Sequence, residues 1–121
     1  MPGDIVVSHT NIYRVQTNQP LQLQVTIGDG QVGGTALTLN GAPVAFDSSA
    51  GQATVGQPGT SLVGSILQCA TTVQDINPST NNTSVTYHLT GGLAVQDFPF
   101  AAQVTADSGL ARYNITFLLS A

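Results

Sequence analysis

The polar stretch QDINPSTNN, residues 74–82, has the residue types that could bind a ligand. Its candidate ligand residues are Asp75, Asn77, Ser79, Asn81 and Asn82. The first three of these alternate side-chain oxygens, the ligands that hard cations such as Ca²⁺ prefer, and the whole loop could also face a sugar. An ordinary turn competes with this interpretation, because Asp and Asn form Asx turns and Pro fixes φ. We favour the turn, since calcium sites usually use several carboxylates and this loop has one.

A second candidate binding segment is HTNIYRV near the N-terminus, with Asn11, Tyr13 and Arg14 as its ligand residues. Neutral hydrogen-bonding side chains suit sugars, and an exposed aromatic ring supplies a stacking surface. The segment therefore predicts a possible glycan contact. The sequence has only three Tyr and four Phe, so such surfaces are scarce.

The residues that could take part in catalysis or metal binding do not have the sequence spacing of a known catalytic or metal-binding motif. His9, His88 and Cys69 are the only imidazole and thiol groups, and no two of them have the spacing of metal ligands. No Gly-x-Ser-x-Gly motif occurs, and paired carboxylates would have to come from six Asp and no Glu. We expect no enzyme, no catalytic residue, no metal and no cofactor. Cys69 has no partner for an internal disulfide, and we expect it to be buried.

The charge content limits the partners. Only 7% of residues are charged, the net charge is −4 and the only cations are Arg14 and Arg112. An ordinary soluble domain has roughly 25% charged residues. A chain with two cations cannot neutralise a row of phosphates, so nucleic-acid binding is excluded. The length of 121 residues predicts a single domain over residues 1–121, and no stretch is apolar enough to predict a membrane span.

The beginning of the chain, MPGDIVVSHTNIYRV, lacks the basic region and the continuous apolar region of a signal peptide. We therefore expect no signal peptide. The low charge and the abundance of Thr and Asn are nevertheless typical of extracellular or virion-surface proteins, and we expect an extracellular or virion-associated location.

Alternating apolar and polar residues predict strands along most of the chain. PLQLQVTIGDG alternates without a break, and SVTYHLT and LARYNITFLL do so later. In TALTLNGAPVAF, Asn40 and Gly41 tolerate the positive φ of a type I′ turn, which predicts a tight hairpin. Pro43 then predicts that the second arm of this hairpin has an edge or a bulge, where a missing N–H does no harm. The run from Leu62 to Val73 has mostly apolar or small residues on both faces and predicts a central strand of a packed sandwich.

These short strands predict an all-β fold, an antiparallel β-sandwich of immunoglobulin-like architecture. The alternatives are a small jelly roll or β-barrel. The Cys pair and the Trp of true immunoglobulin domains are absent, so the resemblance is one of architecture and implies nothing about function.

The absence of Lys bears on function, because Lys, Pro and inward charges ordinarily protect sheet edges from pairing. We expect the edges to be covered or paired, so we predict a homo-oligomer or a module of a larger extracellular or virion assembly. The function predicted first is therefore a non-enzymatic structural or protein-recognition module with a protein partner. The alternative is a carbohydrate-binding, lectin-like module that binds a glycan with or without calcium. A small hydrolase is a third class.

Overall fold

The computed structural model describes residues 4–15, 19–47, 51–56, 62–105 and 109–120. Within these residues the regular structure consists of β1 (Ile5–Arg14), β2 (Leu21–Ile27), β3 (Val32–Leu39), β4 (Ala42–Val44), β5 (Gln52–Gly56), β6 (Ile66–Gln74), β7 (Asn82–Thr90), β8 (Gln96–Gln103) and β9 (Leu110–Ser120). None of the described residues belongs to a helix that could cross a membrane.

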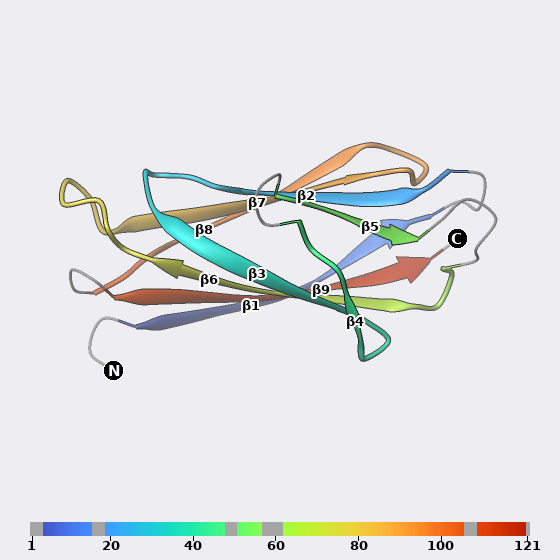
Figure 1. The fold of residues 1–121 in the computed structure, drawn as a ribbon, viewed down its shortest axis with the longest axis horizontal. Helices are drawn as coiled ribbons and strands as arrows, with labels where there is room; N and C mark the ends of the chain where they lie inside the picture. The colour runs from blue at the N-terminus through green and yellow to red at the C-terminus, as the bar shows by residue number, and fades with distance from the viewer. Residues whose placement is uncertain (1–3, 16–18, 48–50, 57–61, 106–108, 121) are drawn as a thin grey trace.

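The strands form two sheets that pack against each other (Figure 1). One sheet has the order β1-β9-β6-β3-β4 and the other has the order β5-β2-β7-β8. β1 and β9 are parallel, and the remaining pairs of neighbouring strands are antiparallel. The predicted all-β architecture is confirmed at this level.

The core lies between the sheets, where the inward side chains of the alternating strands meet. On β7, Val85, Tyr87 and Leu89 are completely buried, as the alternation predicts. β9 contributes its own inward series, Tyr113, Ile115, Phe117 and Leu119. Burial of large apolar side chains of this kind stabilises a fold by about 1.5–3 kcal/mol each, which makes this layer the main source of stability.

The hairpin between β3 and β4 confirms a local prediction. Asn40 and Gly41 have φ values of 50° and 84°, the left-handed conformation that a type I′ turn requires at both positions. Thr38 lies opposite Pro43 on β4, which is the last strand of its sheet. Proline is tolerated there because an edge strand has one side without a partner.

The strand predicted from Leu62 to Val73 needs a correction. β6 begins at Ile66, because Gly64 has a φ of 84° and turns the chain before the strand starts. β6 is central in its sheet, between β9 and β3, as expected. Its outer face is exposed, since burial alternates along the whole strand.

Two buried hydroxyl pairs connect the sheets. The hydroxyl of Tyr87 on β7 lies 2.6 Å from that of Thr71 on β6, and the hydroxyl of Tyr113 on β9 lies 2.6 Å from that of Thr83 on β7. Burial raises the pKa of both tyrosines, so their hydroxyls remain neutral inside the fold. Cys69 is buried as predicted, and burial raises the pKa of its thiol to about 12.

Candidate functional site

The polar loop after β6 is organised around a residue from another part of the chain. Gln31, which precedes β3, is buried and its Nε2 lies 2.9 Å from the Oδ1 atom of Asp75. The same nitrogen lies 3.3 Å from the carbonyl oxygen of Thr80 and 3.0 Å from that of Asn82. Asp75 is itself only 4% exposed. One side chain therefore holds both ends of the loop, and the carboxylate predicted as a ligand faces inward.

The oxygen of the same amide holds the middle of the loop. Gln31 Oε1 accepts hydrogen bonds from the backbone N–H of Ile76, at 2.8 Å, and of Asn77, at 2.9 Å. The side chain of Asn77 accepts from the backbone N–H of Ser79, which is an Asx turn, and donates to the carbonyl of Asp29. These polar groups therefore serve the loop itself.

The remaining loop residues lie at the start of β7. The carbonyl of Asn81 accepts a hydrogen bond from the backbone N–H of Val104, and the side chain of Asn82 is exposed. Among the described residues there is no group of three or more His, Cys, Asp or Glu that could hold a metal ion. The structure thus brings the predicted loop residues together around Gln31, and ligand binding by the loop stays a prediction.

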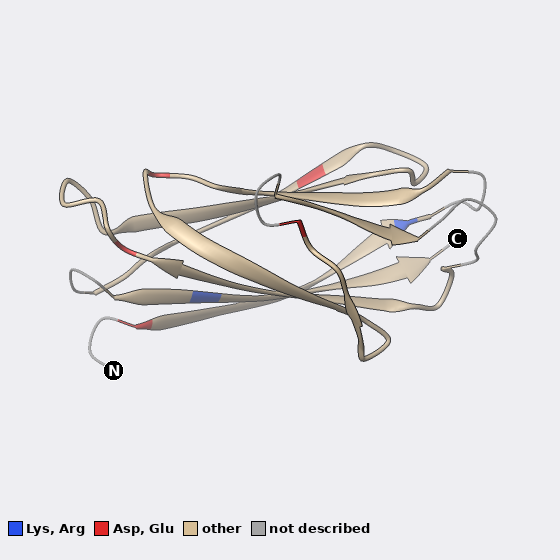
Figure 2. Ribbon diagram, viewed as in Figure 1, with Lys and Arg blue, Asp and Glu red and all other residues tan. Residues whose placement is uncertain are grey.

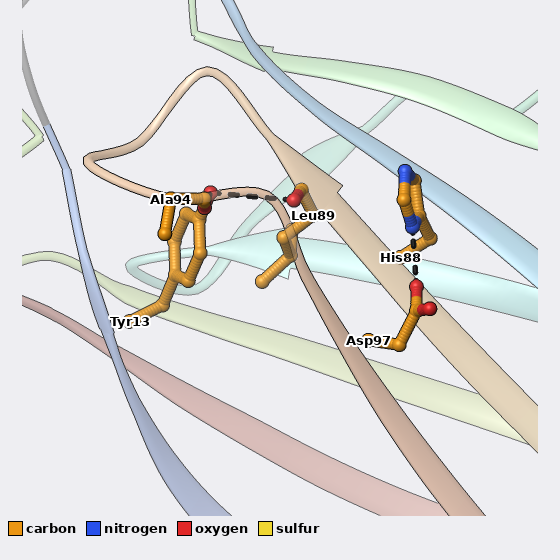
Figure 3. Close-up of polar contacts among 5 residues, drawn as sticks. All are labelled: Tyr13, His88, Leu89, Ala94 and Asp97. Atoms are coloured by element: carbon orange, nitrogen blue, oxygen red, sulfur yellow. Dashed lines mark hydrogen bonds and ion pairs between the residues drawn. The ribbon is translucent and has the colours of Figure 1, made fainter.

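Tyr13 anchors the turn that precedes β8 rather than facing solvent. Its ring is only 2% exposed, and its hydroxyl donates to the carbonyl of Ala94 at 2.6 Å and lies 3.3 Å from that of Leu89 (Figure 3). The hydroxyl also accepts from the backbone N–H of Gly92, where a Cβ atom would collide with the Tyr13 ring. Burial raises the pKa of this tyrosine. The ring has no exposed face for sugar stacking in this structure.

Asn11 and Arg14, the other candidates on β1, lie on opposite sides of the strand. Asn11 shares the inward face with Tyr13, and its Nδ2 atom is buried without a hydrogen-bond partner among the described residues. Arg14 is exposed, and its carbonyl accepts a hydrogen bond from the backbone N–H of Leu93. The structure therefore does not bring these three residues into one binding site.

The edge of β1 that faces away from β9 is open. The Val15 N–H points to β9, where it donates to Ser120, whereas the Arg14 carbonyl points away from β9, to Leu93. Because backbone groups alternate along a strand, the even-numbered residues of β1 also direct their N–H and C=O groups away from β9. We call the backbone groups of Val6, Ser8, Thr10 and Ile12 the open edge. None of the described residues hydrogen-bonds to them.

The other sheet edges in the described chain are short or protected. β4 has three residues and includes Pro43, and β5 has five residues. In β8, Val104 N–H points to β7, so by alternation Pro99 faces outward and offers no N–H, and Asp97 adds a charge beside it. β1 has ten residues, and Ile5 to Tyr13 include neither Pro nor a charged Asp, Glu, Lys or Arg.

The outer face of the five-stranded sheet carries few charges, with Arg14 and Arg112 exposed on it, and has a row of exposed apolar side chains. Ile12, Leu118 and Ile66 lie side by side on β1, β9 and β6 and are 64%, 37% and 42% exposed. Figure 2 shows that charged residues are few on this sheet; Arg112 on β9 pairs with Asp4 at the beginning of β1. The apolar row and the open edge meet at Ile12.

A groove of about 660 Å³ lies on the outer face of the other sheet, beside the segment 45–47. Its lining mixes polar and apolar side chains: Gln22, Leu23, Gln24, Ala45, Phe46, Asp47, Gln52, Ala53, Thr54, His88 and Thr90. Amides and hydroxyls next to one half-buried phenyl ring can donate to, accept from and stack on a small polar ligand. Sequence reasoning missed this groove because β2, β5 and β7 form it only once paired.

His88 at this groove forms a pair with an acid. As predicted, His88 lies on the outer side of β7, but its Nδ1 atom contacts the Oδ1 atom of Asp97 on β8 (Figure 3). A catalytic triad also requires a hydroxyl hydrogen-bonded to the imidazole, and no described residue forms such a bond with His88. His88, paired with this acid, contributes a polar side chain to the lining of the groove.

Comparison with protein-family models, curated proteins and solved structures found no match to this chain. The function is therefore argued from the residues and surfaces described above.

Proposed function

We propose that the protein is a non-enzymatic structural module that assembles with other protein chains through the open edge and the sparsely charged outer face beside it. The observation that carries this proposal is the open edge itself. In this strand of ten residues, Ile5 to Tyr13 include no Pro, Asp, Glu, Lys or Arg, and the backbone groups of Val6, Ser8, Thr10 and Ile12 have no hydrogen-bond partner among the described residues. Such an edge is a template for another strand.

The apolar row supports the same function. Ile12 belongs both to the open edge and to the row with Leu118 and Ile66, so a strand added to β1 would also cover apolar side chains. Burial of apolar area contributes about 25 cal/mol per Å² and does not require charges. This composition fits a chain with 7% charged residues and supports a place in an extracellular or virion assembly.

The immunoglobulin-like label is part of the proposal. Its support is architectural, because two mainly antiparallel sheets enclose one core and successive strands repeatedly cross between the sheets. An experimental determination of the strand order tests the immunoglobulin-like classification. In particular, it should place β8 and β9, which follow one another in the chain, in different sheets.

The proposed assembly is tested by sedimentation of the protein over a range of concentrations, together with the variants Thr10→Pro and Thr10→Ala. Thr10→Pro removes an N–H of the open edge, whereas Thr10→Ala keeps it. We expect the unmodified protein and Thr10→Ala to associate and Thr10→Pro to remain smaller. A protein that is strictly monomeric at every concentration would refute the proposal.

The groove favours a second candidate function, binding of a neutral glycan. Gln22, Gln24 and Gln52 are exposed and line the groove beside Phe46. Calorimetric titration with a mixed glycan pool tests this candidate, with Gln24→Ala as the groove variant and Gln74→Ala as the control on the other sheet. Glycan binding in the groove is supported if the unmodified protein and Gln74→Ala give heats of binding and Gln24→Ala does not. No heat and unchanged melting with millimolar sugars would remove it.

A further inference from the structure

We propose that the open edge binds β1 of a second copy of this chain, antiparallel, with a two-fold axis between the two His9 residues. The proposal rests on the proposed function, because it names the partner of the same surface. A strand that pairs with its own copy about a two-fold axis perpendicular to the sheet is necessarily antiparallel, and the contact closes as a dimer.

The exposed apolar side chains of β1 select this register. Val6 and Ile12 are 62% and 64% exposed and lie at equal distances in sequence from His9. With the axis at His9, Val6 of each copy lies opposite Ile12 of the other. Apolar pairs across neighbouring strands contribute roughly 0.2–1 kcal/mol each relative to small side chains, and the symmetry forms the pair twice.

The neighbouring registers are less complementary. With the axis at Ser8, Val6 faces Thr10 of the second copy and Ile12 faces Asp4. With the axis at Thr10, Val6 faces Arg14 of the second copy. Each of these registers places an exposed apolar side chain opposite a charged one, whereas the axis at His9 does not.

Backbone geometry allows the same register. Val6 opposite Ile12 and Ser8 opposite Thr10 join residues whose N–H and C=O groups all belong to the open edge. In an antiparallel ladder each such pair exchanges two hydrogen bonds. His9 belongs to the alternate set whose backbone faces β9, so the two His9 residues would form a non-hydrogen-bonded pair at the axis.

The ends of the ladder bring charged residues together. The register places Asp4, whose carboxylate pairs with Arg112 of its own copy, beside Arg14 of the other copy. On the outer face, the row of Ile66, Leu118 and Ile12 continues into Val6 of the second copy. The dimer thereby lengthens the apolar row instead of leaving Ile12 at its end.

Cysteine scanning along the inward positions of β1 tests the register. In a non-hydrogen-bonded pair the Cα atoms are about 4.5 Å apart, within the range of a disulfide. His9→Cys should therefore form a disulfide between two copies on mild oxidation. Val7→Cys should not, because in this register the two Val7 positions are four residues apart along the strands, about 13 Å. The native thiol of Cys69 is buried and does not compete.

Ser79→Cys, at an exposed position of the 75–82 loop, measures cross-linking by collision. We expect His9→Cys to cross-link about tenfold faster than Ser79→Cys or more, and Val7→Cys and Asn11→Cys no faster than this control. If Val7→Cys or Asn11→Cys cross-links fastest, or if no β1 variant exceeds the control in an associated protein, the register is wrong while assembly through the edge survives. A protein that is monomeric throughout overturns both proposals.

Discussion

The loop after β6 and the edge of β1 differ in what their polar groups contact. In the loop, Gln31 hydrogen-bonds to Asp75 and to the backbone of Ile76 and Asn77, while Ser79 and Asn82 are exposed. From Val6 to Ile12 of β1, the backbone groups that face away from β9 form no hydrogen bond with any described residue. The buried polar groups of the loop are satisfied internally, whereas a strand of ordinary composition carries backbone groups without a partner among the described residues.

This difference shows that polar composition and available hydrogen-bonding capacity are separate properties. A buried donor or acceptor without a partner costs about 1–3 kcal/mol, so a fold uses nearby polar side chains to satisfy its own turns first. Backbone groups at a sheet edge remain available because solvent satisfies them until another strand arrives.

Removal of the loop's central amide should have the largest effect. Gln31→Met keeps the approximate shape of the side chain but removes every hydrogen bond of the amide, including those to Asp75 and Ile76. We expect a loss of about 3 kcal/mol in the free energy of unfolding. Chemical denaturation measures this loss, with the exposed Gln74→Met as the control. A change below that of the control would mean that Gln31 does not organise the loop.

Proline substitutions in β1 should distinguish the N–H groups that face β9 from those of the open edge. Asn11→Pro removes an N–H that faces β9 and should cost about 2 kcal/mol or more, whereas Thr10→Pro removes one from the open edge and should cost less than about 1 kcal/mol. Thermal and chemical unfolding of both variants at low protein concentration measure the difference. Equal losses would contradict the assignment of the even-numbered residues to the open edge.

Substitution of the two buried amides, Gln31 and Asn11, should change the stability of the fold in opposite directions. Asn11 Nδ2 has no partner among the described residues, in contrast to the amide of Gln31. Asn11→Val removes this unsatisfied donor and introduces a residue that favours strands. We therefore expect the free energy of unfolding to increase by about 1 kcal/mol. Denaturant titration checks the sign, and a destabilised variant would show that Asn11 makes a favourable contact.

Salt should have the smallest effect on association. Between Asp4 and Arg14 the open edge has no Asp, Glu, Lys or Arg, and exposed ion pairs at its ends would contribute only about 0–1 kcal/mol each. Sedimentation in low and high salt should give nearly the same dissociation constant. Strong dissociation in moderate salt would mean that charges dominate the contact.

Local features of the fold could be predicted from the sequence because their causes are local. Asn40 and Gly41 adopt positive φ in any fold that contains this hairpin, and the alternation in β7 identifies Tyr87 as inward before any neighbour is known. The start of β6 was less predictable, because Leu62 and Val63 continue the apolar pattern through the turn at Gly64.

The site could not be predicted to the same extent because its contacts are distant in the chain. Gln31 lies 44 residues before Asp75, and nothing around it in the sequence marks it as buried. His88 acquires Asp97 only when β7 and β8 pair. Likewise, β1 becomes an edge only because β9, from the other end of the chain, is its neighbour.

Hydrogen exchange of individual amides, measured at low and high protein concentration, tests the central claim most directly. The N–H groups of Ile76 and Asn77 in the loop, and of His9 in β1, should be protected at both concentrations. The N–H groups of Ser8 and Thr10 on the open edge should exchange rapidly at low concentration and become protected at high concentration. Rapid exchange of Ser8 and Thr10 at every concentration would contradict the account.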